Sequence, residues 1–278
     1  MTATVPLRFT KMHGAGNDFV IVDRRSGRVD LPDDLVARLA DRHRGVGFDQ
    51  LITIDPPRSP DAVAAYSILN ADGSQAAQCG NGARCVAAWL IRAGATQSSC
   101  FTLDSPVGRL LAQVEKDGIG IAMGVPDFSP AAVGLKLDQA DPYPFALNGE
   151  TIEAGAVSMG NPHAVIVVDD TMLADIERIG PALQRHPAFA DSCNVGFAQV
   201  IDAGTIRLRV YERGVGETLA CGSGACAAVA VLARRGLVSE RVSVHLPGGI
   251  LHLRWAGAGH SIHMSGPATF VFEGELLS

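Results

Sequence analysis

Short apolar runs, separated by glycine and polar residues, dominate the first half of the chain. The run FVIV (Phe19 to Val22) follows a Gly-Asn pair, QLITI spans Gln50 to Ile54, and a third run ends at Asn70. Four to eight apolar residues between turn signals are typical of buried strands. We therefore predict three strands in this half, each beginning or ending at a polar residue.

The second half repeats this pattern. A Gly-Asn pair precedes the apolar run from Ala164 to Val168, and a second run spans Phe197 to Ile201. The segment from Ile206 to Tyr211 alternates branched and charged residues and ends beside Glu212. Alternation with a period of two indicates a strand that is buried on one face. Three strands are again predicted.

Two longer stretches have a different pattern. CGNGARCVAAWLIRAG begins at Cys79, and CGSGACAAVAVLARRG begins at Cys221. Each stretch has small or apolar side chains on nearly every face, which is typical of a helix that is buried on all sides. Gly94 and Gly236 stand where the C-terminus of such a helix favours glycine. We predict a central buried helix after each cysteine.

The two stretches align without a gap at an offset of 142 residues and share eight of sixteen positions. GNDFVIVD resembles GNPHAVIVVD, and VGFDQL resembles VGFAQV, in the same order along the chain. Asn70 and Glu212 each stand nine residues before their cysteine. A set of matches in one order indicates an internal duplication.

The duplication predicts a mixed α/β fold of two pseudo-symmetric domains, each a barrel-like curved β-sheet around a central apolar helix. The segment Gly124-Val125-Pro126 is the best boundary between them. We expect an N-terminal domain of residues 1–123 plus 268–278 that carries Cys79, and a C-terminal domain of residues 124–267 that carries Cys221.

Composition narrows the class of protein. The 278 residues carry a net charge of -6 with 47% hydrophobic residues, which disfavours a nucleic-acid partner and suits a large core. No signal peptide or membrane span is recognisable, so we expect a cytoplasmic protein with no membrane partner. The six cysteines should then be reduced. Their spacing fits no zinc site, and no metal is expected.

We expect the reactive site at the two cysteines that are directly followed by glycine, Cys79 and Cys221. A glycine-rich helix N-terminus offers backbone N–H groups and partial positive charge to a carboxylate or phosphate. The same environment favours the thiolate of the adjacent cysteine. Pseudo-twofold symmetry would set two such thiols on opposite sides of one ligand carbon. One could then remove a proton from one face while the other donates a proton to the opposite face, as inversion of a stereocentre requires.

Motifs along nearly the whole chain resemble the diaminopimelate epimerase family. The matching stretches are KMHGAGNDF, GFDQL, NADGS, CGNGARC, SMGNPH, YERGVGET, ACGSGA and LPGG. The resemblance implies a cofactor-independent isomerase that interconverts LL- and meso-diaminopimelate by a two-base mechanism, in lysine and cell-wall precursor biosynthesis. It implies a small-molecule substrate and no cofactor, and it suggests a homodimer. Phe272 stands where many members have tyrosine in a region that contributes to the dimer interface.

By this resemblance Cys79 and Cys221 are the acid–base pair. His163 and Glu212 lie beside the reacting centre, help to hold the α-amino group and set proton positions. Arg213 is the natural partner of the distal carboxylate, because a guanidinium pairs with it bidentately. The remaining implied substrate-binding residues are Asn17, Gln50, Asn70, Asn161 and Asn194, with the backbone amides of Gly80, Asn81, Gly222 and Ser223 for the reacting carboxylate.

Other functions stay open at this point. A sibling isomerase, such as a proline or hydroxyproline racemase, would share the two thiols but needs no partner for a second charged end. A thiol redox protein would use Cys79 and Cys221 as a disulfide pair. A non-catalytic anion-binding protein would use the glycine-rich turns alone. A pyridoxal enzyme is disfavoured, because none of Lys11, Lys116 and Lys136 stands in a recognisable Schiff-base motif.

Overall fold

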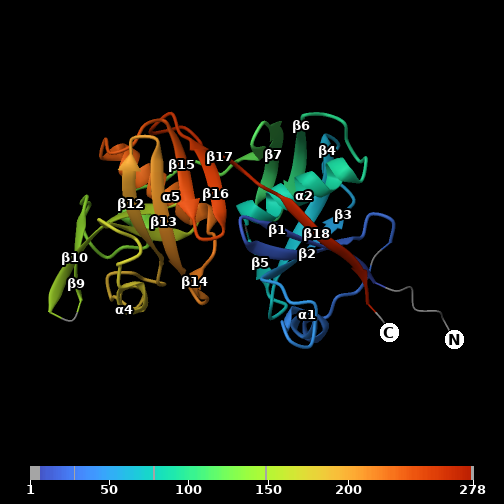
Figure 1. Ribbon diagram of the computed structural model, residues 1–278, viewed down its shortest axis with the longest axis horizontal. Coiled ribbons are helices and arrows are strands. Elements are labelled where there is room, and N and C mark those ends of the chain that lie inside the picture. Colours follow the sequence, from blue (N-terminus) through green and yellow to red (C-terminus); the bar gives the residue numbers. More distant parts are fainter. Residues whose placement is uncertain (1–6, 28, 78, 148, 277–278) are drawn as a thin grey trace. The chain divides into compact units, whose positions relative to one another are not determined.

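The computed structural model describes residues 7–27, 29–77, 79–147 and 149–276. The chain divides into two compact units (Figure 1). The N-terminal unit comprises residues 1–121 and 266–278, and the C-terminal unit comprises residues 122–265. Within the described ranges, the helices are too short or too polar to cross a membrane.

In the N-terminal unit, β2 runs parallel to β3, β3 is antiparallel to β4, and β4 is parallel to β6. β6, β7 and β8 follow as an antiparallel meander, and β1 joins β2 to β18. The elements are β1 (Arg8–Gly14), β2 (Asn17–Asp23), α1 (Asp33–Ala40), β3 (Gln50–Asp55), β4 (Ala62–Asn70), β5 (Gln75–Ala76), α2 (Gly80–Arg92), β6 (Cys100–Ser105), β7 (Gly108–Glu115), β8 (Gly118–Ala122) and β18 (Thr269–Glu275).

The C-terminal unit repeats this order of pairing. β11 runs parallel to β12, β12 is antiparallel to β13, β13 is parallel to β15, and β15 to β17 form the meander. The elements are α3 (Pro130–Val133), β9 (Tyr143–Leu147), β10 (Glu150–Ser158), β11 (Pro162–Val167), α4 (Ile176–Gln184), β12 (Asn194–Asp202), β13 (Thr205–Glu212), β14 (Gly216–Thr218), α5 (Gly222–Arg234), β15 (Arg241–Leu246), β16 (Gly249–Arg254) and β17 (His263–Gly266).

The continuous apolar runs follow from burial of the sheet on both faces. In β2, Val20 and Val22 join the core on the side of α1, together with Leu51 of β3. Phe19 and Ile52 point to the other side, close to Gly82 at the start of α2. Strands that are covered on both faces lose the alternation of apolar and polar residues.

The two central helices differ in how completely they are covered. α5 packs against β10, β11, β12, β13 and β16, and its residues from Gly224 to Leu232 are buried. α2 packs mainly against β1, β2 and β3, and Trp89 and Ile91 on it are only half-buried. The Trp89 indole donates to the Thr10 hydroxyl at 3.0 Å. The prediction of a helix buried on all sides therefore holds for α5 and is wrong for α2.

The predicted mixed α/β class with curved sheets is confirmed, although the sheets are not closed into barrels.

The segment LDSPVGRL (Leu103 to Leu110) contains the end of β6, a turn and the start of β7. Ser105 of β6 pairs with Gly108 of β7, so Pro106 and Val107 form a two-residue turn between these strands. Proline lacks a backbone N–H, and it is tolerated in this turn because the ladder needs no hydrogen bond from that position.

Candidate functional site

The predicted site residues of the N-terminal unit gather at one edge of its sheet. Asn17 begins β2 and Gln50 begins β3, while the antiparallel strand β4 ends there at Asn70. Phe19 pairs with Gln50, and Gln50 pairs with Asn70. α2 begins directly after Cys79 at the same edge. The topology therefore brings together residues that are far apart in sequence.

The C-terminal unit has the same arrangement. His163 of β11 pairs with Asn194, which begins β12, and β13 ends at Glu212. α5 begins directly after Cys221. Glu212 therefore takes the place of Asn70, and His163 takes the place of Phe19. The repeat is thus a repeat of strand register as well as of sequence.

Each cysteine is the N-cap of its helix. Cys79 (φ -145) and Cys221 (φ -119) have extended backbones, and their sulfurs accept hydrogen bonds of 3.4 Å from the amides of Gly82 and Gly224. A cap of this kind satisfies one of the free N–H groups of a helix N-terminus. Gly80 and Gly222 are the first residues of α2 and α5.

The second glycine of each motif allows close packing of helix and sheet. A Cβ on Gly82 would lie 2.8 Å from Ile52 Cδ1. A Cβ on Gly224 would lie 3.1 Å from Val210 Cγ2. The pattern Cys-Gly-x-Gly therefore combines a thiol cap with a helix start where a Cβ would press on a side chain of the facing strand.

The Asn17 amide is the centre of the polar contacts around Cys79. The turn that precedes it is tight, with Ala15 and Gly16 at φ values of 53 and 89, as in two-residue hairpin turns. Asn17 Oδ1 accepts from the Cys79 sulfur at 3.4 Å and from Asn81 Nδ2 at 3.2 Å. Asn81 Oδ1 accepts in turn from the buried guanidinium of Arg84 at 2.9 Å.

Gln50 and Asn70 form a second contact at this edge. Gln50 Nε2 donates to Asn70 Oδ1 at 3.0 Å, and Asn70 Nδ2 donates to the Ser74 hydroxyl at 3.1 Å. Both amides are therefore oriented by neighbours that the sequence motifs NADGS and GFDQL supply.

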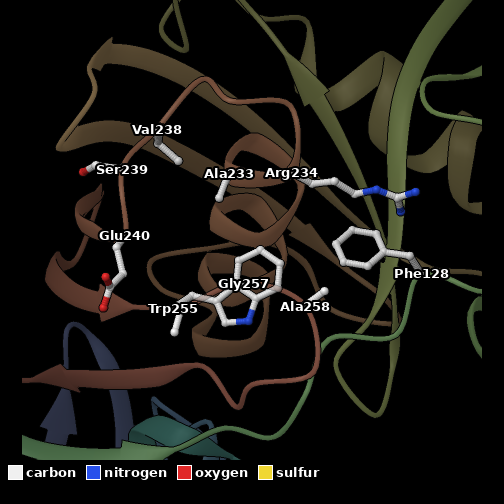
Figure 2. Close-up of a pocket in the computed structure, with 10 residues that line it drawn as sticks. Phe128, Ala233, Arg234, Val238, Ser239, Glu240, Trp255, Gly257 and Ala258 are labelled. Carbon is white, nitrogen blue, oxygen red and sulfur yellow. The ribbon is translucent and has the colours of Figure 1, made fainter.

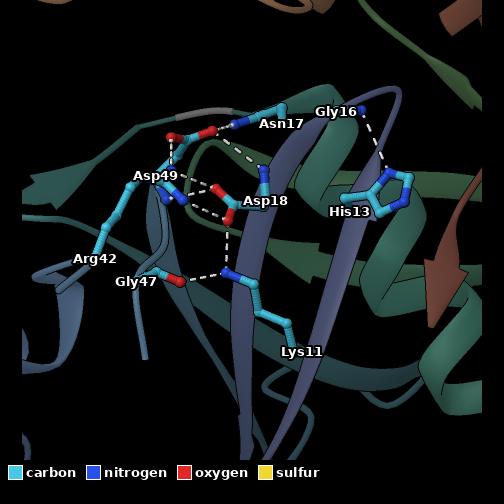
Figure 3. Close-up of polar contacts among 8 residues, drawn as sticks. All are labelled: Lys11, His13, Gly16, Asn17, Asp18, Arg42, Gly47 and Asp49. Atoms are coloured by element: carbon cyan, nitrogen blue, oxygen red, sulfur yellow. Dashed lines mark hydrogen bonds and ion pairs between the residues drawn. The ribbon is translucent and has the colours of Figure 1, made fainter. Parts of the chain in front are cut away.

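Lys11, Asp18, Arg42 and Asp49 form a cluster of charged residues that holds Asn17 through a hydrogen bond to Asp49 (Figure 3). The Asp49 carboxylate accepts from Asn17 Nδ2 at 2.7 Å and from Arg42 at 2.8 Å. Asp18 accepts from Arg42 at 2.8 Å and from Lys11 at 2.5 Å. Burial raises the pKa of Asp18, but the hydrogen bonds from Arg42 and Lys11 outweigh it and lower the pKa to about 2. The Asp18 carboxylate is therefore charged across the physiological range.

The corresponding amide in the C-terminal unit is Asn161. Its Nδ2 donates to the Ser223 hydroxyl at 3.5 Å, at the position where Asn17 meets Asn81 in the other unit. Its Oδ1 lies 3.0 Å from His163 Nε2. A carbonyl oxygen only accepts, so this contact assigns the proton to Nε2 of His163.

In the C-terminal unit, burial is the main cause of the shifted pKa values of His163 and Cys221. It lowers the pKa of His163 to about 3, and the nearby Arg213 charge adds to the effect, so the imidazole is neutral. Burial also raises the pKa of the Cys221 thiol well above its ordinary value, and the Glu212 carboxylate raises it further. Burial therefore opposes the expected preference of a helix N-terminus for thiolate at Cys221. The hydrogen bonds from Ser223 and Gly224, which lower the pKa of Cys221, do not offset the loss of water.

Glu212, Asn194 and Arg213 complete the set in the C-terminal unit. The Glu212 carboxylate accepts from the Thr218 hydroxyl at 2.5 Å. Asn194 Oδ1 accepts from the backbone N–H of Arg213 at 3.0 Å. The exposed Arg213 guanidinium donates to the Asp191 carbonyl at 2.9 Å. Arg213 is therefore anchored at its backbone while its side chain faces solvent.

The other four cysteines differ from this pair. Cys85, Cys193 and Cys226 are buried, and Cys100 is exposed on β6. Burial raises the pKa of both Cys85 and Cys193 to about 12. These two buried thiols pack as small apolar side chains.

A hollow of about 660 Å³ lies at the C-terminal end of α5 (Figure 2). Phe128, Arg234 and Trp255 line it, and the Arg234 guanidinium lies 4.6 Å from the centre of the Phe128 ring. None of the predicted site residues belongs to this hollow. It is at the opposite end of α5 from Cys221.

Two features of the site are missing from the sequence predictions. Arg84 is fully buried within CGNGARC, and its contact with Asn81 was not foreseen. Asp49 precedes the predicted residue Gln50 and contacts Asn17 directly. The stretches GNDF and GFDQL contain the signal, because each sets an aspartate beside a predicted polar residue at a strand start.

Comparison with known proteins gives matches over most of the chain. The family model described as diaminopimelate epimerase matches residues 9–129 and 155–271. A diaminopimelate epimerase of Xanthomonas campestris pv. campestris is 57% identical over 272 residues, which cover 97% of this chain and 96% of the relative. One from Xylella fastidiosa strain M12 is 56% identical over 272 residues, with the same coverage of 97% and 96%.

Solved structures of low identity share the fold. A hydroxyproline epimerase from Agrobacterium vitis, with bound trans-4-OH-L-proline, aligns with a TM-score of 0.71 at 17% identity and covers 99% of this chain and 94% of that one. A PhzF-family phenazine biosynthesis protein from Enterococcus faecalis aligns with a TM-score of 0.70 at 13% identity and covers 99% and 100%.

Proposed function

The chain belongs to the diaminopimelate epimerase family, and on that premise we propose that it interconverts LL- and meso-diaminopimelate by a two-base mechanism. The observation that carries this proposal is the pair of thiols, each at the N-cap of an equivalent helix. As an isomerase, the enzyme must break and remake one C–H bond without net transfer of any group.

In this mechanism the two units present Cys79 and Cys221 to opposite faces of the α-carbon. One sulfur, as thiolate, accepts the α-proton, and the electron pair of the C–H bond passes into the α-carbon and its carboxylate. The other sulfur, as thiol, gives its proton to the opposite face. The two cysteines exchange protonation states, and the configuration at the carbon is inverted.

The helix N-termini bind the carboxylate at the reacting carbon. The backbone amides of Gly80 and Asn81, and of Gly222 and Ser223, belong to the first turns of α2 and α5. N–H groups in the first turn of a helix are suited to an anion, and they stabilise the charge that grows on the carboxylate as the proton leaves.

His163 and Glu212 act beside the α-amino group. The Glu212 carboxylate provides an acceptor and negative charge for the ammonium, while the neutral His163 ring fixes Asn161. Asn194 and the exposed guanidinium of Arg213 bind the distal end of the substrate. We assign Asn17, Gln50 and Asn70, which lie at the ends of β2, β3 and β4, to substrate binding as well.

A sibling isomerase is the second candidate, because a hydroxyproline epimerase shares the fold. Such a substrate has one carboxylate and gives Arg213 no partner. The test is to follow the purified protein with LL-diaminopimelate and, separately, with L-proline and trans-4-OH-L-proline, without added cofactor. We expect meso-diaminopimelate to form and both prolines to stay unchanged. Turnover of a proline without turnover of diaminopimelate would favour the second candidate.

We also propose a cytoplasmic homodimer with β18 at its interface. Val271 and Phe272 on this strand are 54% and 47% exposed, and a second copy would bury them. Light scattering on the purified protein tests this, and Phe272→Glu should shift a dimer to monomer.

A further inference from the structure

The Asn17 amide lies between a carboxylate and the Cys79 thiol. Asn17 Nδ2 donates to Asp49 Oδ2 at 2.7 Å (Figure 3). A carboxylate only accepts hydrogen bonds, so Asp49 selects the NH₂ end of the amide. The carbonyl end of Asn17 therefore faces the sulfur, which donates to it at 3.4 Å.

A second amide is oriented from the opposite side. The Arg84 guanidinium, whose side chain is fully buried, donates to Asn81 Oδ1 at 2.9 Å. A guanidinium only donates, so it selects the carbonyl end of Asn81. Asn81 Nδ2 is then the end that meets Asn17, at 3.2 Å. The chain of hydrogen bonds from Arg84 through both amides to Asp49 has one direction.

Asp49 is itself held in place. Its Oδ1 accepts from Arg42 at 2.8 Å, and its Oδ2 also accepts from the Asp18 amide at 3.1 Å. Arg42 is bound in turn by both oxygens of Asp18, at 2.8 and 3.0 Å. The carboxylate that orients Asn17 is therefore fixed by a cluster that spans three segments of the chain.

We infer that Asp49 and Arg84 are positioning residues that fix the Asn17 and Asn81 amides so that the Asn17 carbonyl oxygen accepts a hydrogen bond from the Cys79 thiol. The inference rests on the proposed role of Cys79 in proton transfer. It assigns to Cys79 the proton-donor form of the mechanism, with its S–H bond held along a defined S–H···O=C direction. The amide of Gly82 also donates to the sulfur, at 3.4 Å.

In the described part of the other unit, the corresponding amide has different partners. The Asn161 carbonyl lies against His163 Nε2 at 3.0 Å, and Ser223 replaces Asn81. The Cys221 sulfur lies 3.6 Å from the Ser223 hydroxyl, which can donate or accept. The two cysteines, though equivalent by duplication, are therefore prepared differently.

The infrared S–H stretching band of Cys79 tests the inference. The band is identified by its loss in Cys79→Ser, and Asn17→Leu gives its frequency without the carbonyl acceptor. In the native protein we expect a band at lower frequency than in Asn17→Leu, because an S–H hydrogen bond weakens the stretch. Asp49→Ala should move it toward the Asn17→Leu value. The side chain of Asp49 is 44% exposed, so its loss should not prevent folding.

The matched control is Asp61→Ala, which removes an exposed aspartate of the same unit that pairs with Arg109. It should keep the native frequency. A native frequency in Asp49→Ala, or a Cys79→Ser spectrum that has lost no S–H band, would overturn the inference.

Activity gives a second readout. Asp49→Ala should lower kcat/KM for diaminopimelate about tenfold, Asp49→Glu should recover part of the loss, and Asp61→Ala should match the native enzyme. Native kcat/KM in Asp49→Ala would contradict the positioning role. If the native protein does not epimerise diaminopimelate, the proposed function fails, but the infrared comparison still decides the orientation of Asn17.

Discussion

The Glu212 carboxylate lies close enough to the Cys221 thiol to raise its pKa, in addition to the larger effect of burial. Glu212 occupies the position that Asn70 has in the other unit, so the duplication sets a charge beside one cysteine and a neutral amide in the other half. The two halves therefore differ in electrostatics while they share topology. An epimerase acts on both configurations of one carbon, so it can use a charge that lies beside only one of its two cysteines.

Removal of the Glu212 charge should make Cys221 more reactive. Glu212→Gln removes the second cause of the raised pKa and leaves burial, so the pKa falls but stays high. We expect the Cys221 peptide to be alkylated by iodoacetamide severalfold faster at neutral pH, as read by mass spectrometry. Glu240→Gln, an exposed glutamate of the same unit, should leave the rate unchanged. Equal rates in Glu212→Gln and the native protein would show that the carboxylate does not act on the thiol.

His163 should make the fold sensitive to acid. Its pKa is about 3 in the folded protein against an ordinary value of 6.5 for histidine, so the folded state binds fewer protons than the unfolded state. Its contribution to stability is full above pH 6.5 and is lost as the pH falls. From this residue alone the free energy of unfolding should drop by about 2 kcal/mol between pH 7 and pH 5.

His163→Phe, which installs the residue of the duplicate position, should remove that part of the drop in urea unfolding. Exposed His43→Phe is the control and should keep the native pH dependence. If both variants show the native drop, His163 titrates normally.

The close approach at Gly82 should be measurable as coupling. Gly82→Ala sets a Cβ against Ile52 Cδ1 and should cost about 1–3 kcal/mol of unfolding free energy. Ile52→Val removes that methyl group. In the Ile52→Val background, Gly82→Ala should therefore cost at least about 1 kcal/mol less. Additive costs in urea unfolding of the four proteins would mean that the strain lies elsewhere.

Arg213 should act on binding of the distal carboxylate. Arg213→Met should raise KM for diaminopimelate at least about tenfold with a smaller change in kcat, because a charged pair is lost far from the reacting bond. The KM of Arg213→Lys should lie between the values of the native enzyme and of Arg213→Met. The neighbouring exposed Arg185→Met is the control. A loss confined to kcat would instead place Arg213 at the reacting centre.

Much of the framework could be predicted from local patterns. The runs FVIV and QLITI locate β2 and β3 because a sheet covered on both faces leaves no polar alternation. The Cys-Gly-x-Gly pair locates the starts of α2 and α5, since a cap and a close approach both have local signatures. These features depend on few neighbours, and the repeat of each makes the assignment firm.

The missing features depend on distant neighbours. The cluster around Asp18 joins Lys11, Arg42 and Asp49 through strand register and a loop, which no sequence window contains. Arg84 interrupts an apolar stretch and gives no sign that it is fully buried. The protonation of Cys221 depends on a balance of burial against the helix N-terminus, and burial can be measured only in the folded protein.

The central claim is that Cys79 and Cys221 act as two separate bases on one carbon. The most direct measurement is the reaction of LL-diaminopimelate in deuterated water with native enzyme, Cys79→Ser and Cys221→Ser, followed by mass spectrometry and by chromatography of the stereoisomers. We predict that the native enzyme forms meso-diaminopimelate with one deuterium at the inverted carbon, and that each variant loses inversion by at least about a thousandfold. Inversion at a native rate in either variant would contradict the two-base account.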